Sequence, residues 1–207
     1  MSDSTVFKQI YRLAEPYLRT RFNDVHTQIS MQLAYDLMSA EGGQERIVIP
    51  AIILHDVGWH KIPASLHLKA FGPNATSPEL NRTHEREGVR IAGRILKEVN
   101  YDGEKISEIL KIIDGHDSRK ESISLNDSLV KDADKLWRFT HTGFHIDNQR
   151  FEESVADGLD RLRKYLPGWF FTDTAHQIAK EELQQREREA KNDSRLAGNS
   201  PGADWKF

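Results

Sequence analysis

Apolar residues recur at helical spacing along most of this 207-residue chain, and this period limits the folds that it can adopt. From Val25, further apolar residues follow at Ile29, Leu33 and Leu37, and two glycines end the run. The same pattern predicts helices over residues 5–18 (bent at a proline), 46–57, 81–102, 105–113, 127–139, 148–165 and 173–191. No segment alternates apolar and polar residues convincingly. The sequence therefore predicts an all-α fold, a bundle of about seven to eight helices.

The most apolar stretch is IVIPAIIL, at residues 47–54. Its composition also suits a buried strand. A single strand without partner strands is hard to place in a sheet, so we expect a buried helix. The stretch is too short to span a bilayer.

The chain length favours one domain, which we place at residues 1–190. Residues 62–78 contain three prolines and a glycine, and form a candidate lid or substrate loop. Residues 191–207 are polar and rich in Gly, Asn and Ser, so we expect a loosely ordered tail. The preceding helix is amphipathic, which makes a homodimer reasonable.

Charge and composition exclude several classes of partner. The net charge of -3 gives no basic signature of nucleic-acid binding. The N-terminal segment does not have the pattern of a signal peptide, so we expect a cytoplasmic protein without membrane contact. Because the chain has no cysteine, any metal must be held by histidine nitrogen and carboxylate oxygen. Such ligands suit divalent Mn, Fe, Co, Ni, Zn or Mg.

Histidines and aspartates lie in or beside the predicted apolar helices, mostly near their ends. They are His26, the pair His55–Asp56, His84, His116 and Asp134. Histidines and carboxylates from separate helices are how a helical bundle builds a divalent metal site. Adjacent residues on a helix point about 100° apart, so His55 and Asp56 can share one metal only where the helix ends or deforms. Gly58 makes such an end plausible.

The order of His26, His55–Asp56 and Asp134, within the strings LHDVG and KDADKL, resembles the HD-domain superfamily of metal-dependent phosphohydrolases. The similarity spans residues 20–140. It implies that these four residues bind a first metal ion. Asp132 competes with Asp134 for the ligand role, and the resemblance favours Asp134. By similarity to the binuclear branch, His84 and His116 bind a second ion, with Asp56 bridging. The chain departs from that branch at Trp59–His60–Lys61 and at Asp117. These departures count against a cyclic-dinucleotide phosphodiesterase and not against metal binding. One or two metal ions both stay open.

The resemblance implies hydrolysis of a phosphate ester or anhydride in a small, nucleotide-like, anionic substrate. The candidate catalytic residues are Asp56, as proton acceptor, and Glu85 or Asp117, as general acid or base. The candidate phosphate clamps are Lys61 and Arg119.

Three alternatives stay open on the sequence alone. The same ligands suit a di-iron oxygenase of the HD type. The fold could instead serve a regulatory module that binds a nucleotide without turnover. His26 and His55 could also be core histidines that bond to Asp134 or to the backbone.

Overall fold

The protein is described by a computed structural model over residues 3–73 and 75–198, with side chains described as far as residue 192. Within those residues all regular structure is helical, as the sequence predicts. The α-helices are α1 (Asp3–Leu18), α2 (Asn23–Glu41), α3 (Glu45–Leu54), α4 (His67–Ala70), α5 (Glu79–Glu98), α6 (Gly103–Ile113), α7 (Leu125–Leu136), α8 (His141–Phe151), α9 (Val155–Tyr165) and α10 (Asp173–Gly198). Short 3₁₀ helices lie at Val57–Lys61, Ala64–Leu66, Trp137–Phe139 and Leu166–Gly168.

Helix α3 is the most buried helix of the N-terminal half of the bundle. Every residue from Ile47 to Leu54 is buried, and α1, α2, α6 and α7 all contact α3. A helix that is apolar on all sides must be enclosed by other elements, which explains why IVIPAIIL is a helix and not a strand. The surrounding helices bury one stripe each, as α1 does with Phe7, Ile10, Ala14 and Leu18.

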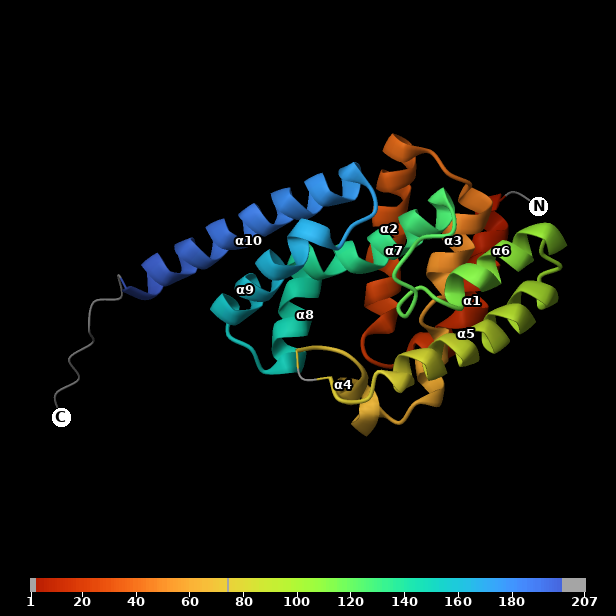
Figure 1. The fold of residues 1–207 in the computed structure, drawn as a ribbon, viewed down its shortest axis with the longest axis horizontal. Helices are drawn as coiled ribbons and strands as arrows, with labels where there is room; N and C mark the ends of the chain where they lie inside the picture. The colour runs from red at the N-terminus through yellow and green to blue at the C-terminus, as the bar shows by residue number, and fades with distance from the viewer. Residues whose placement is uncertain (1–2, 74, 199–207) are drawn as a thin grey trace.

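The bundle has two ends, which Figure 1 shows. Helices α1, α3, α5 and α6 form one end, α8, α9 and α10 form the other, and α2 and α7 lie between them. In the described part of the chain, none of the helices combines the length and apolarity that crossing a membrane requires.

The expected single helix over residues 148–165 is wrong. Glu152 has a left-handed backbone (φ 56°), and its N–H bonds to the carbonyl groups of Asn148 and Gln149 and ends α8. Ser154 then caps α9 by accepting a hydrogen bond from the N–H of Asp157. This break and the four-residue α4 bring the described part of the chain to ten α-helices, above the expected seven to eight.

Other helix boundaries also differ from the expected ones. Helix α3 ends at Leu54, before the His–Asp pair, and α10 continues to Gly198, into the segment expected to be a loose tail. The rest of that expected tail, residues 199–207, lies outside the described residues.

Candidate metal centre

Seven side chains converge where α2, α3, α5, α6 and α7 meet. His26 lies in the first turn of α2, His84 on α5 and Asp134 on α7, whereas the pairs His55–Asp56 and His116–Asp117 follow the last residues of α3 and α6. Six of the seven are at most 8% exposed, and Asp117 is exposed. The pair His55–Asp56 therefore lies beyond a helix end, where adjacent side chains can turn toward one point.

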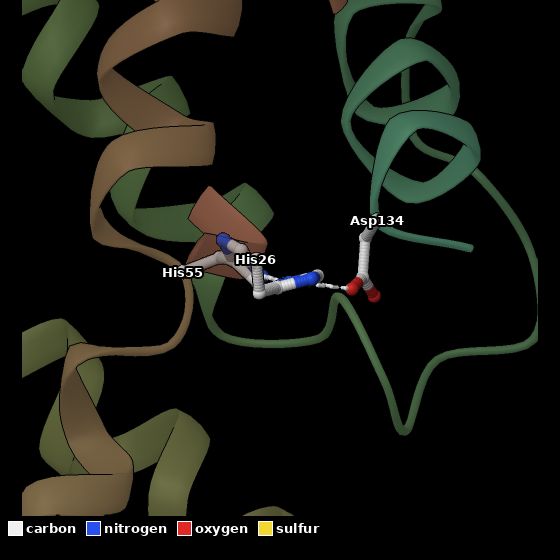
Figure 2. A group of neighbouring side chains, drawn as sticks. All are labelled: His26, His55 and Asp134. Atoms are coloured by element: carbon white, nitrogen blue, oxygen red, sulfur yellow. Dashed lines mark hydrogen bonds and ion pairs between the residues drawn. The ribbon is translucent and has the colours of Figure 1, made fainter. Parts of the chain in front are cut away.

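His26, His55 and Asp134 form the first triad, shown in Figure 2. The Nε2 atoms of His26 and His55 are 2.9 Å apart. Asp134 Oδ1 lies 3.2 Å from His26 Nε2 and 3.6 Å from His55 Nε2. The three ligand atoms thus face one common point.

His84, His116 and Asp117 form the second triad. The Nε2 atoms of His84 and His116 are 3.1 Å apart. Asp117 Oδ2 lies 3.6 Å from His84 Nε2 and 3.9 Å from His116 Nε2. Asp117 had been considered for acid–base chemistry, and this placement also gives it the position of a ligand.

Asp56 lies between the triads. Its Oδ2 is 3.7 Å from the Nε2 atoms of both His26 and His55. Its Oδ1 is 3.8 Å from His84 Nε2 and 3.7 Å from His116 Nε2. Each carboxylate oxygen therefore faces a different triad, which is the geometry expected of a bridging ligand.

The donor atoms fit divalent metal ions. His55 Nδ1 donates to the Ile52 carbonyl at 2.7 Å and His116 Nδ1 donates to the Ile113 carbonyl at 2.9 Å. Because a carbonyl oxygen only accepts, each neutral ring must present the lone pair of Nε2 to the cluster. Two nitrogens that bind one ion at about 2.1 Å, at a right angle, lie about 3 Å apart, which matches both histidine pairs.

The electrostatics of the cluster also favour a cation. Burial would lower the pKa of His116, yet Asp56, Asp117 and Asp134 outweigh it and raise that pKa to about 10. Burial likewise opposes ionisation of Asp56, but the neighbouring histidines hold its pKa well below the usual range. The three carboxylates thus stabilise positive charge at His116, whereas burial lowers the pKa of His26 and of His84.

Glu85 is hydrogen-bonded to the turn that follows α6. Its Oε1 accepts hydrogen bonds from the backbone N–H groups of Asp117 (3.0 Å) and Ser118 (2.8 Å). Its Oε2 accepts from the Ser118 hydroxyl and from Arg82. Burial would raise the pKa of Glu85, but His116 and these hydrogen bonds lower it. Through these contacts Glu85 fixes the turn that carries His116 and Asp117, and its acid–base role stays a prediction.

One of the two predicted phosphate clamps, Arg119, lines a cavity that also borders the triads. Lys61 is exposed and does not line the cavity between them. Arg119 lines this neighbouring cavity together with His116, Asp117 and Asp134, and its Nη2 pairs with the buried Asp127 at 2.9 Å. Both clamp roles stay predictions. Asp132 is also absent from the cluster, since it accepts hydrogen bonds from the N–H groups of Phe171 and Thr172.

Three arginines that sequence reasoning missed line the cavity beside Asp56, Asp117 and Asp134. They are Arg21, Arg138 and Arg150. Arg138 lies one helical turn after Asp134, and this spacing was the one signal that could have revealed it. Arg21 and Arg150 are remote in sequence and meet only in the fold, where Arg150 Nη2 donates to the Arg21 carbonyl at 2.6 Å.

The HD domain family model matches residues 24–138, more than half of the chain and all seven residues of the cluster. The chain belongs to the HD-domain family. The crystal structure of a predicted HD superfamily hydrolase from an uncultured Thermotogales bacterium has a similar fold, with a TM-score of 0.60 and 20% sequence identity. The alignment covers 93% of this chain and 92% of that one. No curated protein matches the chain.

Proposed function

We propose that the protein is a metal-dependent phosphohydrolase that cleaves a phosphate ester or anhydride of a small molecule. The observation that carries the proposal is Asp56, which turns one carboxylate oxygen toward each of two histidine–aspartate triads. Two metal ions bridged by a carboxylate form a clamp suited to displacement at phosphorus. Membership of the HD-domain family and the description of the structural neighbour as a predicted hydrolase support the same class of reaction.

Bound divalent ions would supply a water of lowered pKa and polarise the phosphoryl oxygen. The chain itself positions the ligands. Trp59 Nε1 donates to Asp56 Oδ1 at 3.0 Å, which orients the bridging carboxylate. The backbone carbonyls of Ile52 and Ile113 orient the rings of His55 and His116.

The direct test is phosphate release by protein loaded with Mn²⁺, Mg²⁺ or Co²⁺, against a panel of phosphomonoesters, phosphodiesters and nucleotides. We expect turnover in wild type and in Asp36→Asn, an exposed control on α2, and its loss in Asp56→Asn. No release with any ion, or release that Asp56→Asn retains, would contradict the proposal. Oxygen consumption by iron-loaded protein would indicate the di-iron oxygenase, and nucleotide binding without turnover would indicate the regulatory module.

A further inference from the structure

The guanidinium group of Arg21 is held between two aromatic rings beside the metal centre. Its central carbon lies 3.8 Å from the Trp59 ring centroid and 4.0 Å from that of Phe71. Trp59 stacks in turn on His84, with ring centroids 4.2 Å apart and an interplanar angle of 16°. Stacking fixes the plane of a guanidinium, so the position of Arg21 is tied to the second triad.

Arg21 carries polar atoms that the fold does not satisfy. Its Nε and Nη1 are buried and have no hydrogen-bond partner among the described residues. Its backbone is left-handed (φ 56°), which costs a non-glycine residue about 1 kcal/mol or more. Unpaired buried donors and backbone strain at one residue indicate a position kept for binding an acceptor from outside the chain.

Two further arginines, Arg138 and Arg150, line the same cavity. Arg138 Nη1 and Arg150 Nη1 pair with the two oxygens of the buried Asp147, at 2.8 Å and 3.0 Å. Arg138 and Arg150 share this one carboxylate, and Arg21 has no ion pair among the described residues. The arginines therefore leave positive charge on their side of the cavity, facing Asp56, Asp117 and Asp134. Burial lowers the pKa of Arg21 to about 10, which still leaves it charged at neutral pH.

The cavity is small. Its volume is about 70 Å³, which holds roughly five to seven water-sized atoms at 10–15 Å³ each. That is about the size of one phosphoryl group, so the rest of a substrate would lie outside this cavity. Guanidinium groups bind phosphate oxygens through paired hydrogen bonds, so charge, donors and size all match a terminal phosphate.

We propose that Arg21, supported by Arg138 and Arg150, binds the terminal dianionic phosphoryl group of the substrate, and that the substrate is a phosphomonoester. The assignment of a phosphomonoester substrate rests on the proposed function. The binding of phosphate by Arg21 does not. Asp56, Asp117 and Asp134 border the same cavity, and their negative charge repels an anion unless cations occupy the triads. Phosphate binding should therefore require metal ions.

The test is calorimetric titration of the Mn²⁺-loaded protein with inorganic phosphate. Wild type should bind phosphate, and Arg21→Gln should bind it at least about tenfold more weakly because a charge-assisted hydrogen bond is lost. The metal content of Arg21→Gln should match wild type by elemental analysis. Arg19→Gln is the matched control, since this nearby arginine is exposed and pairs with Glu15. If Arg21→Gln does not fold, Arg21→Lys replaces it, and its ammonium group should also weaken binding.

Dimethyl phosphate and acetate distinguish the chemistry of the anion, and neither should compete with phosphate. Unchanged phosphate affinity in Arg21→Gln, equal binding of dimethyl phosphate or acetate, or no phosphate binding by wild type would each overturn the inference. Phosphate binding that depends on Arg21, without turnover of any ester, would instead contradict only the proposed function.

Discussion

The two triads contain the same residue types but have different structural supports. His26 and Asp134 of the first triad project from α2 and α7, two helices that pack against each other, and both are buried. In the second triad, His116 and Asp117 lie in a turn after α6, and Asp117 is exposed. His84 Nδ1 has no hydrogen-bond partner among the described residues. The first triad is therefore rigid by helix packing, whereas the second depends on the contacts of Glu85.

This difference predicts an order of metal binding. Ligands fixed on packed helices lose little freedom when an ion binds, so the first triad should bind the tighter ion. The second triad must order a turn, and its ion should bind more weakly. The variants below test this order, from the largest expected effect to the smallest.

Asp56→Asn should affect both triads, because each faces one oxygen of this carboxylate. Loss of the shared charge should lower the affinity for both ions by more than about a hundredfold. This is more than is usual for residues that only orient ligands. Metal titration followed by elemental analysis measures this, with Asp36→Asn as the control. Loss of only one ion would show that Asp56 does not bridge.

Gly58→Ala should weaken ion binding at the second triad and not at the first. A Cβ atom at Gly58 would lie 1.8 Å from the His84 carbonyl oxygen, so the segment after Asp56 would have to move away from α5. We expect a loss of about 3 kcal/mol in the free energy of unfolding, measured by urea denaturation, and weaker binding of the second ion. The control is Gly93→Ala on α5, where the nearest atom to an added Cβ is 3.7 Å away. This variant should be as stable as wild type or more so. Equal stability of the two variants would contradict this close packing.

Glu85→Gln should weaken the second ion alone. The amide keeps the size of the side chain but loses the charge that accepts from Asp117, Ser118 and Arg82. Outer contacts of this kind change metal affinity by about 10–100-fold. Calorimetry should show the tighter binding step unchanged and the weaker one shifted, and Glu87→Gln on the same helix should shift neither. A shift in both binding steps would contradict the prediction that Glu85 supports only the second triad.

Tyr101→Phe should affect neither ion. The Tyr101 hydroxyl donates to the Arg46 carbonyl at 2.6 Å, and its loss should cost about 1 kcal/mol of unfolding free energy. Burial raises the pKa of Tyr101 to about 12, above its ordinary value of 10. The folded state thus favours the neutral phenol, so the stability difference from wild type is full below pH 10 and declines as the pH rises toward 12. Urea denaturation at several pH values measures this stability difference. An altered metal content of Tyr101→Phe would contradict the expectation that neither ion is affected.

The features that could be predicted from the sequence are those that depend on local sequence patterns. The helical period predicts the all-α fold, and His26, His55, Asp56, His84 and Asp134 were named from their places in predicted helices. The break after Glu152 was missed because a left-handed residue and a serine cap lie inside an apolar pattern that reads as continuous.

Functions that depend on distant contacts were not accessible from the sequence. The contact between Glu85 and the Ser118 turn, and the enclosure of Arg21 by Trp59 and Phe71, join residues that are far apart in the sequence. The expected homodimer stays a prediction, as does the cytoplasmic location.

The central claim is a binuclear centre bridged by Asp56, and titration with Mn²⁺ followed by EPR spectroscopy tests it most directly. We predict two ions per chain: the first should give the signal of an isolated ion, and the second should convert it to the broadened signal of an exchange-coupled pair. Saturation at one ion per chain, or two ions without coupling, would contradict the account.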